Sequence, residues 1–293
     1  MKRRNAVKNL GFGLGGIVIP NSILSGCTDT KAPGKQEKAT HAKVNHSACR
    51  WCYQDIPLEE LAQKSKELGL KAIDLLRPEE WETVRKYGLE CSLGTDVFAD
   101  IQNGFNDVKN HSSLQRNYRD LINKASNAGI KRVIVFSGNR NGKSDNEGIE
   151  NCAVGLDPLV KLAEKKNVTL VMELLNSKID HKDYQCDRTP WGVSLSQKIG
   201  SANFKLLYDI YHMQIMEGDL IHTIKKFHHH IDHYHTGGVP GRNEINSTQE
   251  LNYPAIIKTI VDTGFDGYIA QEFIPTYSDK FKALKEAIEI CTL

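Results

Sequence analysis

The sequence has few cysteines, almost no net charge and no apolar run of transmembrane length. It carries 7 cysteines in 293 residues, too few for a disulfide scaffold. Its net charge is +2, and without the four basic side chains of residues 1–26 the balance becomes −2, with 34 basic against 36 acidic side chains. The charge therefore gives no support for a basic surface that binds nucleic acid.

Apolar residues make up 40% of the chain and charged residues 25%. This ordinary globular composition excludes a polytopic membrane protein, a collagen-like chain and a mostly disordered one. Nucleotide-binding motifs are also missing. No glycine-rich dinucleotide turn follows the first predicted strand, where residues 49–60 read CRWCYQDIPLEE, and no P-loop occurs. Their absence counts against a doubly wound nucleotide-binding sheet.

Residues 1–27 are typical of an export signal. A charged start with Arg3 and Arg4 precedes a weakly apolar stretch, residues 10–24, which at ~1.5 Å per residue is too short to cross a ~30 Å hydrocarbon core. The paired arginines resemble a twin-arginine signal. The sequence LSGC, ending at Cys27, resembles a bacterial lipoprotein cleavage box. We expect an exported, periplasmic-side protein that meets the membrane only through a lipid on Cys27; a cytoplasmic location is the alternative.

The remaining chain divides into a linker and one catalytic domain. Residues 28–45 are polar and lysine-rich. They cannot bury enough apolar surface to offset the entropy of ordering, so a flexible linker is predicted. Residues 46–293 are predicted to form the folded domain.

Short apolar or β-branched runs alternate with helical stretches from residue 46 onward. In residues 57–68 the apolar side chains share one helix face and the charged side chains share another. Gly69, Gly88 and Gly129 precede strand-like runs, at positions where a left-handed residue commonly ends a helix. The predicted strands are residues 48–53, 72–76, 90–94, 132–137, 169–174, 205–210, 231–235 and 268–273.

Eight strand–helix units in about 250 residues predict a fold of the α/β class, a single (β/α)8 TIM barrel. Near-continuous apolar strands suit a parallel sheet that is covered on both faces. No second domain is apparent, and residues 137–151 are expected to form a long loop after the fourth strand.

Carboxylates end three of the predicted strands, at Glu173, Asp209 and Glu272. Since the C-terminal ends of barrel strands meet at one face, these side chains should share one space, where three buried negative charges need a cation. Two glutamates, one aspartate and one histidine form an oxygen-rich set that suits Mn²⁺, Mg²⁺, Co²⁺ or a catalytic Zn²⁺. Alternatively, each carboxylate is a loop-end residue with local hydrogen bonds.

Other polar and aromatic residues lie near the predicted strand ends. We expect Trp51 to form a wall of the pocket, and His181, in the loop after the fifth strand, to contact substrate. Cys49 and Cys52 have the spacing of a redox motif. However, the prediction places them on a strand, so a redox role is not favoured.

Five motifs carry a family resemblance. They are residues 186–192 (CDRTPWG), 206–219 (LLYDIYHMQIMEGD), 240–242 (PGR), 249–254 (QELNYP) and 271–273 (QEF). Through them, residues 47–276 resemble the hydroxypyruvate isomerase family of the xylose-isomerase-like TIM barrels.

The resemblance implies isomerisation of a small α-hydroxycarbonyl compound, hydroxypyruvate to tartronate semialdehyde. It implies that Glu173 and Glu272 are the acid/base pair. It also implies that both glutamates, with Asp209 and His235, are metal ligands like those of the related ketose 3-epimerases. Some hydroxypyruvate isomerases carry glutamine at position 235, so His235 brings the chain closer to the epimerases.

The resemblance further implies that His212 and Arg242 bind substrate oxygens. The substrate is then a small carbohydrate-like molecule. The sequence leaves open the oligomeric state, a homo-oligomer included. Three other functions also stay open: a sugar or ketose 3-epimerase of the same superfamily, a keto-sugar dehydratase of that superfamily, and a sugar-binding lipoprotein without turnover. The carboxylate pair argues against the last, because binding alone does not need both.

The lipid anchor gives the first testable prediction. Expressed in a bacterial host, the full chain should appear in a processed, membrane-associated form. The Cys27→Ser variant should become soluble, because it lacks the thiol that receives the lipid. Pulse labelling and membrane fractionation measure both effects. A variant that migrates and fractionates like the parent would contradict the lipoprotein interpretation.

Overall fold

The computed structural model describes residues 44–293. The predicted export signal, the lipid on Cys27 and the linker up to residue 43 lie outside the described residues. Within the described part, none of the helices combines the length and the apolarity needed to span a bilayer.

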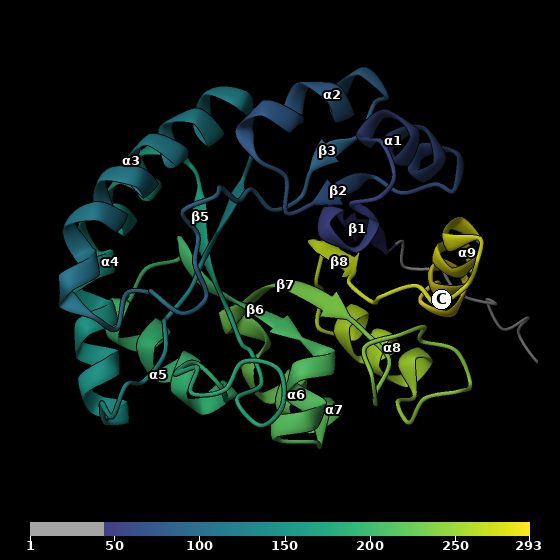
Figure 1. Cartoon of the computed structure of the whole chain (residues 1–293). Coiled ribbons are helices and arrows are strands. Elements are labelled where there is room, and N and C mark those ends of the chain that lie inside the picture. The colour runs from purple at the N-terminus through teal and green to yellow at the C-terminus, as the bar shows by residue number, and fades with distance from the viewer. Residues whose placement is uncertain (1–43) are drawn as a thin grey trace, which may run out of the picture. The chain divides into compact units, whose positions relative to one another are not determined.

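Eight parallel strands form one sheet in the order β3-β2-β1-β8-β7-β6-β5-β4. Figure 1 shows them on the inside of the fold with helices around them. This arrangement confirms the predicted (β/α)8 barrel. The strands are β1 (Asn45–Cys49), β2 (Ala72–Asp74), β3 (Glu90–Cys91), β4 (Arg132–Val135), β5 (Thr169–Glu173), β6 (Phe204–Asp209), β7 (Ile231–Thr236) and β8 (Tyr268–Gln271).

The barrel closes between β3 and β4 through a single glycine. The backbone N–H of Gly94 donates to the carbonyl of Arg132 (2.9 Å), and the N–H of Ile134 donates to the carbonyl of Gly94 (3.0 Å). A Cβ at position 94 would lie 3.3 Å from the Trp81 ring and 3.4 Å from the Arg132 carbonyl. Glycine therefore allows the first and second halves of the barrel to meet.

The helices cover the outside of the sheet. The predicted glycine stops are confirmed, since Gly69, Gly88 and Gly129 have φ values of 89°, 70° and 76°. The helices are α1 (Leu58–Glu67), α2 (Trp81–Lys86), α3 (His111–Ala128), α4 (Asp145–Lys166), α5 (Thr189–Ile199), α6 (Ile210–Met216), α7 (Leu220–Phe227), α8 (Tyr253–Asp262) and α9 (Lys280–Ile290).

Several predicted boundaries are wrong: Asn45, predicted as the end of the linker, begins β1, and several strands end earlier than predicted. The first strand ends at Cys49, and Arg50–Tyr53 form a short 3-10 helix in place of the strand predicted over 48–53. Trp51 and Cys52 therefore lie on this short helix, and only Cys49 of the two cysteines lies on the strand. The loop predicted over 137–151 is shorter, because α4 begins at Asp145, where the Ser144 hydroxyl caps it by accepting from the N–H of Glu147 (3.2 Å).

Polar side chains inside the barrel hold one residue of the candidate site, His235, in position. Asp74 ends β2, whereas His233 and His235 lie on β7, and β1 and β8 separate these strands in the sheet. Asp74 nevertheless contacts both histidines, so these side chains meet across the barrel interior. They lie at alternate positions of β7, which directs both to the same face of the strand.

The closure at Gly94 gives the second prediction. Gly94→Val should lower the melting temperature by about 2–10 °C, because overpacking costs about 1–3 kcal/mol. Gly94→Ala is the matched control and should cost less, since its lone Cβ, 3.3 Å from the Trp81 ring, requires a shift of only a few tenths of an ångström, whereas valine adds two further methyl groups. Thermal unfolding followed by circular dichroism compares the two. A Gly94→Val protein as stable as the parent would show that this contact does not limit closure.

Candidate active site

Four residues converge at the C-terminal ends of neighbouring strands. Glu173 ends β5, Asp209 ends β6, His235 lies near the end of β7, and Glu272 follows β8. One potential ligand atom from each lies within 4.8 Å of those of the other three. All four side chains are buried, and Glu272 and Glu173 retain only 3% and 4% exposure. The structure thus brings together the residues expected to hold a metal.

Two cationic groups lie between the carboxylates. His235 Nδ1 is 2.7 Å from Glu272 Oε2 and 3.3 Å from Glu173 Oε1. Arg242 Nη2 is 3.1 Å from Asp209 Oδ2 and 2.5 Å from Glu272 Oε2. Each cation therefore contacts two carboxylates, and Glu272 contacts both cations.

The environment shifts the carboxylate pKa values in different directions. Burial and the nearby charge of Glu272 raise the pKa of Glu173. Burial also raises the pKa of Asp209, to about 8, although Arg242 opposes the shift. Burial acts in the same sense on Glu272, but Arg242 and His235 outweigh it and hold its pKa well below the ordinary value. Separated pKa values of this kind characterise a pair of carboxyl groups with different roles.

Asp74 holds the outer nitrogen of the His235 ring. Its Oδ2 lies 2.9 Å from His235 Nε2, and its Oδ1 lies 3.0 Å from His233 Nε2 and accepts a hydrogen bond from Ser92. The Asp74 side chain is fully buried. A carboxylate on one imidazole nitrogen fixes the ring and leaves the other nitrogen, here Nδ1, for the site.

The sequence analysis missed Asp74. The only signal was an acidic residue inside the apolar run AIDLL, at the end of the second predicted strand. Such a residue needs a partner when it is buried. The sequence does not show that the partner comes from the seventh strand. Cys49 joins the same cluster, with its Sγ 3.6 Å from Asp74 Oδ2 and 3.9 Å from His235 Nε2.

His212 lies behind Asp209 rather than along the open cleft. Its ring is fully buried, Nδ1 accepts a hydrogen bond from Asn176 Nδ2 (2.6 Å), and Nε2 is 3.6 Å from Asp209 Oδ2 with no hydrogen-bond partner. Burial lowers its pKa well below the ordinary value, which leaves the ring neutral. His181 packs edge-on against this ring at 5.3 Å and itself lines the cleft.

The loop after β7 folds Arg242 back over the site. A Cβ at Gly237 would lie 3.1 Å from Tyr211 and 3.2 Å from Arg242, so glycine permits this packing. The guanidinium lies 5.2 Å from the ring centres of both Trp51 and Tyr211. Trp51 Nε1 also donates a hydrogen bond to Glu272 Oε1 (2.6 Å). Trp51 therefore lines the cleft, as expected, and additionally fixes the glutamate.

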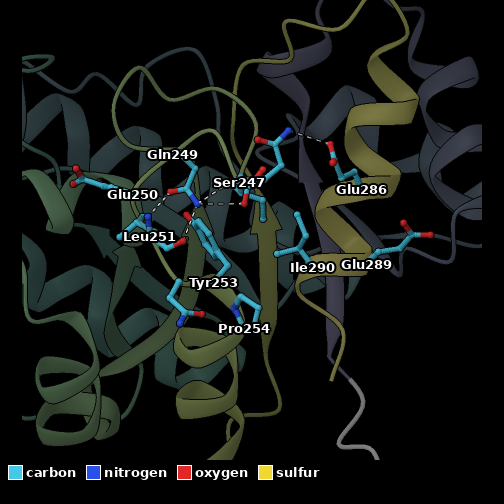
Figure 2. A pocket seen from close by; sticks show the side chains of 12 residues that line it. Ser247, Gln249, Glu250, Leu251, Tyr253, Pro254, Glu286, Glu289 and Ile290 are labelled. Atoms are coloured by element: carbon cyan, nitrogen blue, oxygen red, sulfur yellow. Dashed lines mark hydrogen bonds between the residues drawn. The ribbon is translucent and has the colours of Figure 1, made fainter.

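A cleft of about 780 Å³ opens above these residues. Glu173, Glu272, Arg242, His181 and Trp51 are among its lining residues. A second hollow, of about 740 Å³, lies between residues 245–254 and α9 (Figure 2). Its lining has three glutamates but no histidine, cysteine, aspartate or arginine. The clustered ionisable groups therefore assign the chemistry to the first cleft.

The donor set fits a divalent cation. Three carboxylates and one imidazole nitrogen form an oxygen-rich group of the kind that hard and borderline divalent ions prefer. Glu173 Oε1 is buried and accepts no hydrogen bond among the described residues, and the cationic His235 Nδ1 lies 3.3 Å from it. Such an oxygen is costly to bury unless a cation or a proton meets it.

The fold and this cluster define a (β/α)8-barrel protein with its functional groups at the C-terminal face, as in barrel enzymes. The profile of the family described as xylose isomerase-like TIM barrel matches residues 53–292, and the chain belongs to that family. The hydroxypyruvate isomerase of Escherichia coli (strain K12) is 25% identical over 224 residues, which are 73% of this chain and 86% of the relative.

Solved structures agree on the fold. AP endonuclease, family 2, from Brucella melitensis matches with a TM-score of 0.74 at 19% identity, over 83% of this chain and 97% of that one. D-psicose 3-epimerase with D-tagatose, from Clostridium cellulolyticum H10, matches with a TM-score of 0.68 at 16% identity, over 85% and 100%. The relationship to the hydroxypyruvate isomerase of Escherichia coli supports an isomerase of this family at a general level.

The contact between Asp74 and His235 gives the third prediction. Asp74→Asn should lower the affinity for Mn²⁺ by about 10–100-fold, because the ring loses the carboxylate that orients it. Ser92→Ala is the matched control, since it removes a hydrogen bond to Asp74 but keeps the carboxylate. Isothermal titration calorimetry measures both affinities, and the melting temperature reports on folding. Equal Mn²⁺ affinity in the Asp74→Asn variant and the parent would exclude this positioning role.

Proposed function

We propose that this chain is a metal-dependent isomerase of the hydroxypyruvate isomerase type. It would move a proton between adjacent carbons of a small α-hydroxycarbonyl substrate. One observation carries the proposal: Glu173 and Glu272 both line the same cleft, and a carboxylate oxygen of one lies within 4.8 Å of a carboxylate oxygen of the other. The name of the Escherichia coli relative supports the same reaction.

The residues of the chain supply the proton transfers. One glutamate takes the proton from the carbon that carries the hydroxyl, which leaves an enediolate, and the other returns a proton to the neighbouring carbon. The hydroxyl proton moves from the first oxygen to the second, so that hydroxypyruvate becomes tartronate semialdehyde with no change in composition. Trp51 donates a hydrogen bond to Glu272 Oε1, and Glu272 Oε2 contacts His235 and Arg242, so this carboxylate is held in place at the cleft.

The proposed metal ligands are Glu173, Asp209, His235 and Glu272. A divalent cation bound there would polarise the carbonyl and hydroxyl oxygens of the substrate as a Lewis acid. Arg242 is placed to contact a substrate oxygen, since its guanidinium lines the cleft beside Glu272.

A ketose 3-epimerase is the second candidate, and His235 favours it. The position carries histidine, as in the ketose 3-epimerases that the sequence resembles, where some hydroxypyruvate isomerases have glutamine. The same two glutamates suit this reaction, because epimerisation removes a proton from one face of a carbon and returns it to the other. In either case, we place the activity on the exported side of the membrane, on the basis of residues 1–27 alone.

The fourth prediction concerns the glutamate pair. Glu173→Gln and Glu272→Gln should each lower kcat by at least ~10²-fold, the lower end for a positioned acid or base. The double variant should be little worse than either single one, because groups that act as a unit are not additive. Turnover of hydroxypyruvate and of small ketoses, with deuterium wash-in from D₂O, measures both steps.

Two variants serve as controls. Glu289→Gln removes an exposed carboxylate on α9 and should retain parental turnover. Asp209→Asn should act mainly through metal affinity and recover in part with excess Mn²⁺, since Asp209 is proposed to hold the ion and not to move the proton. If both glutamate variants keep parental turnover and wash-in, the isomerase mechanism fails and a sugar-binding protein without turnover takes its place.

A further inference from the structure

The cleft is much larger than a three-carbon substrate. Hydroxypyruvate has seven non-hydrogen atoms. If each of them takes no more than the ~30 Å³ that a water molecule occupies in the liquid, the whole molecule fills at most ~210 Å³. The cleft holds about 780 Å³. A substrate of that size would leave most of the space filled with water.

The spare room lies on one side of the reacting groups. Glu173, Glu272 and Arg242 come from the β5–β8 half of the barrel, where the proton transfers are proposed. Much of the remaining lining belongs to the first half of the chain, where it follows β1, β2 and β3 or lies on or just after β4. A substrate that reaches from the glutamates into this region needs a unit beyond the reacting carbons.

This distal part of the cleft is apolar at its wall. Leu75, Ile101, Ile134 and Phe136 line it. Leu75 has a φ of 56°, a left-handed conformation that is unfavourable for a leucine. Its N–H donates to the carbonyl of Leu93 (2.8 Å), which holds the residue at the cleft. Non-glycine residues in such conformations concentrate at ligand sites.

The rim of the distal part carries charges of both signs. Arg50 and Arg77 stand beside Glu79, Glu80 and Asp96. Arg50 is already engaged, since its guanidinium donates to the carbonyl of Tyr53 and lies 3.5 Å from Glu80. No cluster of free cations faces this part of the cleft among the described lining residues, whereas a phosphate would call for one. The rim instead offers scattered donors and acceptors.

We propose that the distal part of the cleft binds a second, uncharged sugar ring, so that the substrate is a keto-sugar of disaccharide size. The C–H faces of a pyranose ring match the apolar wall, and its hydroxyl edge matches the mixed-charge rim. A disaccharide has 23 non-hydrogen atoms and fills at most ~690 Å³ by the same measure, which the cleft accommodates. This inference rests on the proposed isomerase function and specifies its substrate.

Binding measurements on the full chain with Mn²⁺ test the size of the ligand. The probes are D-fructose and the keto-disaccharides isomaltulose, turanose and lactulose, each titrated by calorimetry. At least one keto-disaccharide should bind ten-fold or more tightly than D-fructose. If none reaches ten-fold, the inference is overturned.

Blocking variants test the location. Ala99→Trp fills the distal part, and Val97→Trp adds bulk at a position that is 76% exposed, where folding tolerates it. Each variant should lower the affinity for the keto-disaccharide that the parent binds most tightly, by a factor at least ten-fold larger than the factor by which it lowers the affinity for D-fructose. Val154→Trp, at a position on α4 that is 65% exposed and does not line the cleft, is the control and should bind like the parent. Equal losses for both ligands would overturn the proposed location.

Deuterium wash-in separates the two proposals. Wash-in with hydroxypyruvate or D-fructose, without a ten-fold gain for any keto-disaccharide, supports the isomerase and overturns the second sugar ring. Tighter keto-disaccharide binding that the blocking variants abolish, without wash-in for any probe, supports the second ring and overturns the isomerase.

Discussion

Three carboxylates, those of Glu173, Asp209 and Glu272, are buried within a few ångströms of one another, and their repulsion is the constraint on which the site depends. Two like charges at 4 Å repel by on the order of 4 kcal/mol near a protein surface, before the cost of burial. The structure offsets this repulsion with His235 and Arg242, each of which contacts two carboxylates. A divalent cation is the more compact solution, because it meets several carboxylate oxygens at once.

The same constraint explains polar residues deeper in the barrel. His235 can serve the carboxylates only if its ring is fixed, and Asp74 fixes it from across the interior at 2.9 Å. Asp74 in turn needs partners because it is fully buried, and His233 and Ser92 provide them. A layer that is apolar in many barrels is therefore polar here. The carboxylates at the site thus require a fixed His235, and His235 in turn requires the buried Asp74 deeper in the barrel.

The sequence predicts the fold well because barrel strands are short apolar runs and glycines mark several helix ends. It also predicts which strand ends carry carboxylates, since Glu173, Asp209 and Glu272 each follow such a run. It fails where a feature depends on distant contacts. Asp74 and His235 are 161 residues apart along the chain, and no local pattern joins them. Similarly, Arg50–Tyr53 continue a run that looks like a strand, but they form a 3-10 helix, where the Arg50 guanidinium donates hydrogen bonds to the Tyr53 and Ile56 carbonyls.

The two halves of the barrel differ in how strongly the backbone fixes their cleft residues. The chemical groups of β5–β8 lie on or beside strands, where the hydrogen-bond register between strands fixes their relative positions. The distal wall is built largely by loops after β2 and β3, which tolerate changes in length and sequence because fewer backbone pairings constrain them. A barrel of this kind can keep one proton-transfer site while its first half changes the size and polarity of the ligand. Under the proposal of a second sugar ring, residues such as Leu75 and Ile101 select the substrate, whereas the carboxylates that carry the family resemblance supply the proton transfer.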